Sequence, residues 1–539
     1  MQIKTTGATQ RQSAIIAAFA ERHSAVEASL ELEVGISSAM TRETFSLRAS
    51  RTGSSVTARL EVSDDSAVRW GLNALRRWLA TDGAELDLSD RPAFRWRGVI
   101  EGFYGTPWSR EQRLRGVEHF GDFGMNLFLV APKDAQWQRF AWREPLSIEF
   151  VAALSELIAK GSEHAVDVSA CVSPGLSVTY SDDADVAAVV AKFKQMHDVG
   201  ARHFGLLLDD IPDTLSVQAD IERYGNIAKA HADFANRVRE GLMALDPQSH
   251  VILCPMHYAG RGTEPYLQVM GDELHPQIDL MWTGRDICSS YLDIADAVVF
   301  DRTTRRPPFY WDNYPVNDGS MIRRLHIGPI EGREAGLERY SAGLLANPME
   351  FFEASLLPLG TIGDYLWDSR GYDAWASWER VLADLVPVEA DRLAIRDLFR
   401  NSLGLGGGWS PAFNTVLGEC SKAWRAGDVA AAAAAARGYG SAIAANVERI
   451  RAADFCAPLL RDDVAPWLDK YELGGGLLGE FATVLEQLRS VPGQGLSGAV
   501  ELRDALVSLR RRFNDNQQRL FGDGYDQMFA ELIAETDFR

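Results

Sequence analysis

Short apolar runs alternate with helical segments between residues 94 and 370, and this alternation constrains the fold more than any other feature. The runs are WRGVIEGF (96–103), MNLFLVAP (125–132), DVSACVSP (167–174), FGLLLDD (204–210), HVILCP (250–255), IDLMWTG (278–284), PFYWDN (308–313) and SLLPLGTIGDYLW (355–367). Such alternation is typical of parallel βα units. Eight units over this length predict a closed (β/α)8 TIM barrel, with an open doubly wound sheet as the alternative.

The segment before this region has a different pattern. Three runs have apolar residues at period two, and we expect them to form strands: ASLELEVG (28–35), TFSLRAS (44–50) and SVTARLEV (55–62). A helix is expected over residues 65–80, where the apolar spacing is helical and Asp64 and Asp65 suit the N-terminus. Residues 1–90 are therefore predicted to form a small α/β domain that precedes the barrel domain at 94–370.

Strand patterns are missing from residues 375–539, which we expect to form a helical bundle. The segment at 427–455 is rich in Ala, and the segment at 500–521 is amphipathic. A Gly-rich loop at 403–408 is expected to lead into these helices. The GxGxxG match at 474–479 follows no strand, so we interpret it as a turn between two helices rather than a nucleotide-binding loop.

Charge and composition exclude several classes of function. The 539 residues carry a formal net charge of −20, which argues against nucleic-acid partners and anionic membrane surfaces. Five scattered Cys form no CxxC pair, and the ten His show no metal-ligand spacing. The N-terminal sequence resembles no signal peptide, and no apolar stretch is long enough to span a membrane. We therefore expect a cytoplasmic protein.

Carboxylates, amides and aromatic residues follow most of the apolar runs. The active site of an α/β barrel lies at the carboxyl ends of its strands, so these residues are expected to share one rim. The aromatic residues suit a sugar ring, although each of them could instead pack the top of the barrel. They are Tyr104, Trp108, Tyr258, Trp282 and Trp311.

The adjacent carboxylates Asp209 and Asp210 follow the apolar run GLLL. Mutual repulsion and partial burial are expected to raise the pKa of at least one of them, as a general acid requires. The alternative is that one of the pair caps the next helix. Lys133, at the end of the second run, could donate to a sugar hydroxyl or pair with Asp134.

Eight ordered motifs together resemble the O-GlcNAcase family, glycoside hydrolase family 84. They are RGVIEGFYGTPW (97–108), MNLFLVAPKD (125–134), WREP (142–145), LLLDDI (206–211), CPMHY (254–258), MWTG (281–284), WDNYPVND (311–318) and ANP (346–348). The resemblance implies a retaining β-N-acetylglucosaminidase whose substrate is a glycoprotein or a small glycoside. It implies no metal and no cofactor, because the 2-acetamido oxygen of the substrate attacks C1 and forms an oxazoline.

The resemblance also implies roles for single residues. Asp209 would bind the acetamido N–H, and Asp210 would act as general acid and then as general base. The residues implied to bind the sugar are Gly102, Lys133, Tyr258, Trp311, Asn313, Asp318 and Asn347. Ile287 is expected to lie near the pocket wall.

The chain departs from the family pattern beside these positions. Ala135 stands where a second acidic residue is common, and Met256 and His257 replace a Thr-Glu pair. These changes flank the implied contact residues, and we expect them to alter the leaving-group side and the tuning of the pocket rather than the reaction. A non-catalytic glycan-binding barrel is the alternative function.

Overall fold

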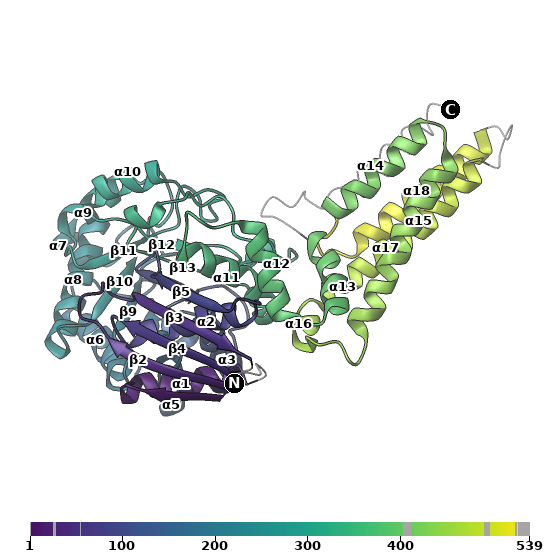
Figure 1. Ribbon diagram of the computed structural model, residues 1–539. Helices are drawn as coiled ribbons and strands as arrows, with labels where there is room; N and C mark the ends of the chain where they lie inside the picture. The colour runs from purple at the N-terminus through teal and green to yellow at the C-terminus, as the bar shows by residue number, and fades with distance from the viewer. Residues whose placement is uncertain are drawn as a thin grey trace. The chain divides into compact units, whose positions relative to one another are not determined.

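The first compact unit contains a closed barrel of eight parallel strands, which confirms the predicted fold class (Figure 1). The computed structural model describes residues 2–24, 29–53, 55–402, 411–489, 496–522 and 525. Around the barrel the strands follow chain order, and the last pairs with the first. They are β6 (Trp96–Glu101), β7 (Leu127–Val130), β8 (Asp167–Val172), β9 (His203–Leu207), β10 (His250–Cys254), β11 (Ile278–Trp282), β12 (Phe309–Asp312) and β13 (Gly343–Ala346).

Helices connect these strands in the expected alternation. The connections include α3 (Arg110–Asp122), α4 (Gln136–Arg139), α5 (Ile148–Glu163), α6 (Asp183–Asp198), α7 (Gln218–Tyr224), α8 (Ile227–Leu245), α9 (Pro265–Glu273), α10 (Ile294–Thr304) and the 3-10 helix η2 (Leu337–Tyr340). Buried side chains fill the barrel interior, among them Leu129, Ile252 and Leu345. The interior is therefore a packed core, and the chemistry is confined to its rim.

The eighth strand was predicted in the wrong place. Residues 355–367 belong to helix α11 (Phe352–Trp367), whereas β13 is the four-residue segment Gly343–Ala346. A helix buried on all sides has the same continuous apolar composition as a buried strand, and Pro358 inside it made the run look less helical. The true strand is too short to stand out, but it ends directly before Asn347.

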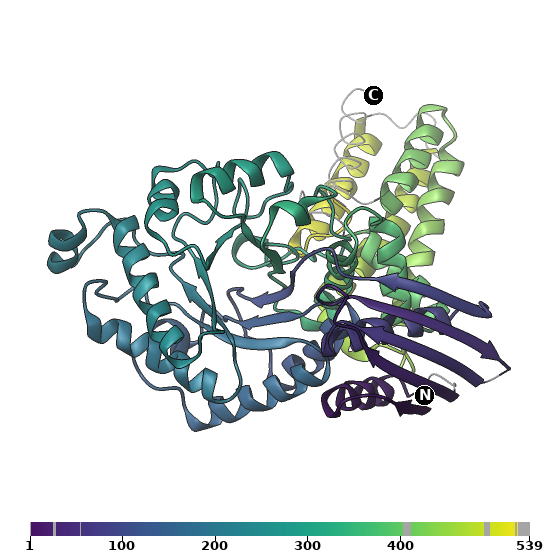
Figure 2. The same ribbon diagram turned by 60° about the vertical axis from the view of Figure 1, so that its left-hand side comes forward.

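A five-stranded sheet forms the N-terminal part of the same unit, in the order β1-β2-β4-β3-β5. Its strands are β1 (Gln2–Thr6), β2 (Ser29–Ile36), β3 (Phe45–Thr52), β4 (Ser55–Val62) and β5 (Glu85–Asp90). Alternate residues of β2 and β4 are buried on the face that packs against α1 (Gln10–Arg22) and α2 (Asp65–Leu79) (Figure 2). The predicted strands and helix are confirmed, and Asp64 caps α2 through its side chain. β1, α1 and β5 were not predicted.

Ion pairs connect the N-terminal helices and the segment before β3 to the barrel. Arg69 and Arg22 each approach Asp122 at the end of α3, both at 2.5 Å. Although burial alone would raise it, Arg69 and its neighbours hold the pKa of Asp122 well below the usual value. Arg97 of β6 donates to Glu43 at 3.0 Å, and both side chains are buried. Removing one partner of a buried pair would leave its charge unpaired, so these contacts hold the N-terminal sheet and helices on the barrel.

The second compact unit comprises Pro315–Pro329, Phe351–Thr361 and Asp373–Arg539. It contains η1 (Gly319–Met321), α12 (Ala374–Leu385), α13 (Glu389–Arg400), α14 (Pro411–Arg425), α15 (Val429–Arg451), α16 (Pro458–Asp463), α17 (Ala465–Arg489) and α18 (Leu496–Asp515). The structure thus confirms a helical C-terminal region, and Figure 1 shows its long helices α14, α15, α17 and α18 from green to yellow. The three-domain boundaries at 90 and 375 stay a prediction. No described helix combines the length and hydropathy needed to cross a membrane.

The Gly-rich match at 474–479 is not a turn, contrary to the prediction. It lies inside α17, and a Cβ at Gly475 would come within 2.5 Å of Ile443 on α15. A Cβ at Gly440 would likewise meet the carbonyl of Gly475 at 2.7 Å. These glycines are explained by close helix packing rather than by chain reversal. The predicted loop at 403–408 lies outside the described residues.

Burial of His231 on α8 should make the stability of the protein depend on pH. Its ring is fully buried between the hydroxyls of Tyr266 and Tyr180, at 2.8 and 2.9 Å, and burial lowers its pKa to about 3. Below about pH 6.5 the unfolded chain binds a proton that the folded chain does not. The free energy of unfolding therefore decreases as the pH is lowered. Between pH 7 and pH 5 we expect wild type to lose about 2 kcal/mol more than His231→Gln in urea unfolding. Equal losses in both proteins would contradict this.

Candidate active site

A buried ion pair lies at the carboxyl ends of β7 and β9. Lys133 follows β7, Asp209 follows β9, and the Lys133 ammonium contacts Asp209 Oδ2. Both side chains are buried. Burial alone would lower the pKa of Lys133, but Asp209 raises it, so the ammonium stays protonated. The alternative pairing with Asp134 is wrong, since that carboxylate accepts from the Gly105 N–H at 2.9 Å.

The second oxygen of Asp209, Oδ1, is buried and has no hydrogen-bond partner among the described residues. A buried carboxylate oxygen without a donor is costly, and in native proteins such a group has an explanation. An N–H group of a ligand that reached this oxygen would supply the missing donor.

Asp210 contacts two tyrosines on the exposed rim. Tyr104 donates to its Oδ2 at 2.8 Å, and Tyr258 donates to its Oδ1 at 2.9 Å. Its backbone is left-handed, with φ of 52°, which is uncommon for a residue with a Cβ. Strain of this kind gathers at functional sites. The pair does not cap the next helix, because the N-cap of α7 is Val217.

The expected rise in pKa is not found at Asp210. Partial burial would raise it, but the charge of Lys133 and the two tyrosine hydroxyls lower the pKa below its usual value. The effect of burial is therefore outweighed by the charge of Lys133 and by the two hydroxyl donors. The contact also changes the tyrosine, since burial and the charge of Asp210 raise the pKa of Tyr258.

An amide network joins three further strand ends. Asn313 Oδ1 accepts from Trp311 Nε1 and from Asn347 Nδ2, both at 2.9 Å, and Asn313 Nδ2 donates to the Ile287 carbonyl at 2.8 Å. Asn347 Oδ1 accepts from the Gly102 N–H at 3.1 Å. A Cβ on Gly102 would lie 2.3 Å from the Trp311 ring, so only glycine allows the backbone so close. Lys133 Nζ lies 5.2 Å from the centroid of the same ring, which joins this network to the carboxylates.

Eight of the nine predicted site residues thus lie in the first unit, where side-chain contacts connect them in two groups. One group is Asp209 with Lys133, Trp311, Asn313, Asn347 and Gly102, and the other is Asp210 with Tyr258. The ninth, Asp318, belongs to the second unit, where it precedes η1, and its role stays a prediction.

Two predicted rim aromatics are core residues instead. Trp108 packs among Phe103, Phe120 and Phe128, and Trp282 stacks on Phe300. The pattern of strand ends could not separate a side chain that lines the rim from one that packs beneath it.

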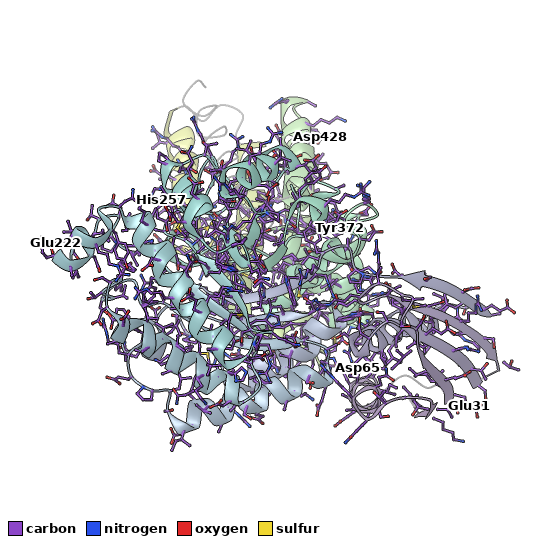
Figure 3. The ribbon with its side chains drawn as sticks, turned by 90° about the vertical axis from the view of Figure 1, so that its left-hand side faces the viewer. Glu31, Asp65, Glu222, His257, Tyr372 and Asp428 are labelled. Carbon is purple, nitrogen blue, oxygen red and sulfur yellow. The ribbon has the colours of Figure 1, made fainter. Side chains whose placement is uncertain are left out.

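The three departures from the family pattern lie next to this site. Ala135 is the N-cap of the short helix α4 and makes no side-chain cap. His257, labelled in Figure 3, packs against the Tyr266 ring at 4.7 Å, and the Met256 N–H donates to the Tyr266 hydroxyl at 3.4 Å. These contacts involve neither Asp209 nor Asp210.

Arg139 is a site residue that the sequence analysis missed. Its guanidinium donates to the Asp210 carbonyl at 2.7 Å and to the Tyr104 hydroxyl at 3.0 Å. It lies on α4 rather than at a strand end, so the rule that located the other residues does not reach it.

In the part of the chain that the structure describes, no three His, Cys, Asp or Glu side chains are arranged to hold a metal ion.

Comparison with known proteins agrees with this geometry. The model of the family described as beta-N-acetylglucosaminidase matches residues 97–399, which is more than half of the chain. The chain belongs to the β-N-acetylglucosaminidase family. That membership confirms the resemblance to O-GlcNAcases drawn from the strand-end motifs.

Relatives of the family support the assignment. The chain is 33% identical over 274 residues to the protein O-GlcNAcases of Rattus norvegicus and Mus musculus, covering 50% of this chain and 29% of each relative. It is thus similar to less than a third of their length. The solved O-GlcNAc hydrolase mutant of Thermobaculum terrenum is 28% identical, with a TM-score of 0.77 over 82% of this chain and 95% of that one. CpGH84B, at 22% identity and a TM-score of 0.82 over 98% of this chain and 96% of that one, supports the fold alone.

The close contact between Gly102 and Trp311 should make the free energy of unfolding sensitive to substitution of Gly102. Gly102→Ala inserts a methyl group where the Trp311 ring lies 2.3 Å away, so ring or backbone must move. Overpacking of this kind costs about 1–3 kcal/mol, which denaturant unfolding measures. Gly476→Ala is the matched control, because nothing lies within 4 Å of its Cβ and Ala favours a helix. Equal stability of both variants would show that the Gly102 contact is unimportant.

Proposed function

We propose that this protein hydrolyses terminal β-linked N-acetylglucosamine with retention, using the substrate's acetamido group as the nucleophile. The observation that carries the proposal is the buried Asp209 Oδ1, an acceptor without a donor beside a protonated Lys133. An acetamido N–H is a donor of the right kind for this oxygen. The natural substrate is a glycoprotein or a small glycoside that carries this sugar.

In the first step, the acetamido carbonyl oxygen forms a bond to C1 while the bond from C1 to the leaving oxygen breaks. Asp209 accepts the hydrogen bond of the acetamido N–H, which makes the carbonyl oxygen more nucleophilic. Asp210 gives its proton to the departing oxygen, and an oxazoline remains that is protonated on nitrogen, its N–H still hydrogen-bonded to the ionised Asp209. Because the nucleophile is part of the substrate, orientation contributes much of the acceleration.

In the second step, ionised Asp210 takes a proton from water, and the water oxygen bonds to C1 on the face that the aglycone left. The bond from C1 to the acetamido oxygen breaks, and Asp210 is protonated again. The two inversions give net retention.

The low pKa of Asp210 in the free protein has a consequence for this cycle. Lys133, Tyr104 and Tyr258 stabilise its ionised form. A bound sugar excludes water from Asp210, and desolvation raises the pKa of a carboxyl group. Substrate binding therefore prepares the acid for proton transfer.

A panel of aryl glycosides that differ only at C2 tests the sugar and the nucleophile together. We expect turnover of the 2-acetamido glycoside and at least about 100-fold slower turnover of the 2-hydroxy glycoside, since an oriented internal nucleophile is worth several orders of magnitude. Equal turnover of both would overturn the internal nucleophile. Tight N-acetylglucosamine binding without cleavage of either would indicate a glycan-binding protein.

Single substitutions separate the two acids. With a poor leaving group, Asp210→Asn should lower kcat/KM about 10²- to 10⁴-fold, the usual contribution of a general acid. With an activated aryl leaving group that needs no proton, the loss in kcat/KM should be much smaller. Asp209→Asn should slow both substrates, because it weakens the internal nucleophile.

Asp213→Asn is the control for these variants, because Asp213 is an exposed carboxylate of the same loop. It should match wild type with both leaving groups. If Asp210→Asn lost equal activity on both, the role of general acid would be wrong.

A further inference from the structure

The backbone of Asp210 is held in a conformation that an L-residue does not favour by itself. Its φ of 52° brings the Cβ close to the following carbonyl. Such a conformation persists only where the surroundings impose it. Arg139 Nη2 donates to the carbonyl of this residue at 2.7 Å, which fixes the peptide directly after the strained position.

The same guanidinium also acts on the carboxylate. Arg139 Nη1 donates to the Tyr104 hydroxyl at 3.0 Å, and that hydroxyl donates to Asp210 Oδ2 at 2.8 Å. Arginine has no acceptor, so the Tyr104 oxygen must accept from it and its own proton points to Asp210. One planar group thus constrains Asp210 at the main chain and at the side chain.

Arg139 is itself held firmly. It is buried on α4, which buried Lys192 of α6 anchors. Lys192 Nζ donates to Trp137 O of the helix at 2.6 Å and to Ala141 O, just beyond the helix, at 3.1 Å. The Ser173 N–H also donates to the Gln138 carbonyl at 2.9 Å. Every residue of this anchor lies in the first unit, so the guanidinium is fixed relative to the rim.

We propose that Arg139 is a positioning residue that orients Asp210 for proton transfer. It donates a hydrogen bond to the Asp210 carbonyl directly and acts on the carboxylate through Tyr104. This inference rests on the proposed function. The charged and titratable groups that act on the Asp210 carboxylate are Lys133, Tyr104, Tyr258 and Arg139, with Asp209 adjacent in sequence. Of these, only Arg139 also holds the Asp210 backbone through a contact of its own.

The experiment compares Arg139→Gln with Arg143→Gln on aryl N-acetyl-β-glucosaminides. Arg143 is the matched control, since it lies four residues on and pairs with Asp185 at 2.6 Å. Arg139→Gln should lower kcat/KM at least about tenfold with poor leaving groups and less with activated ones. Arg143→Gln should match wild type.

The pH profile gives a readout that a merely structural role would not move. Loss of a positive charge and of a polarised donor raises the pKa of Asp210, so the basic limb of kcat/KM should shift to higher pH in Arg139→Gln. Arg139→Lys keeps the charge but lacks the planar guanidinium. Its basic limb should therefore return to the wild-type pH, while its kcat/KM stays below that of wild type. Tyr104→Phe removes only the contact that runs through Tyr104 to the Asp210 carboxylate, and it should shift the same limb of the profile. This variant also tests the proposal if Arg139→Gln fails to fold.

The outcomes separate the two proposals. If wild type released no aglycone from any N-acetylglucosaminide, the proposed function would fall and this inference with it. If wild type were active while the Arg139→Gln and Tyr104→Phe profiles overlaid that of Arg143→Gln, the inference alone would be overturned.

Discussion

Closure of eight parallel strands is the constraint on which the site depends, because it brings the carboxyl end of every strand to one rim. Residues far apart in the chain, such as Gly102 and Asn347, meet there within a single hydrogen bond of 3.1 Å. The closing pair of strands, β13 and β6, positions this contact directly. An open sheet would leave its first and last strands apart, and the amide network could not form.

At this rim, neighbouring acids are placed in different environments. Asp209 is buried against the Lys133 ammonium, whereas Asp210 is exposed and receives two tyrosine hydroxyls. The left-handed backbone between the strand and the loop allows consecutive side chains to serve different partners. One acid is thus suited to hold a buried donor and the other to exchange a proton with a leaving group or water. The difference follows from position, since the side chains are chemically identical.

Much of this arrangement could be predicted from the sequence because it depends on local patterns. Seven barrel strands were marked by apolar runs bounded by polar turns, and the residues at their ends follow from barrel geometry. β13 and the helix at 474–479 could not be recognised, since a four-residue strand is too short and a glycine-rich helix depends on its neighbour α15. The pKa of Asp210 also depends on contacts with Tyr104 and Tyr258 that no spacing in the chain reveals.

The central claim is that the nucleophile belongs to the substrate and is steered by Asp209. The most direct measurement is kcat/KM for aryl glycosides whose N-acetyl group carries zero to three fluorine atoms, because fluorine withdraws electrons from the attacking oxygen. The account predicts a steep, progressive fall in kcat/KM with each fluorine added. Rates that do not change with fluorination would contradict it and would require a nucleophile from the protein.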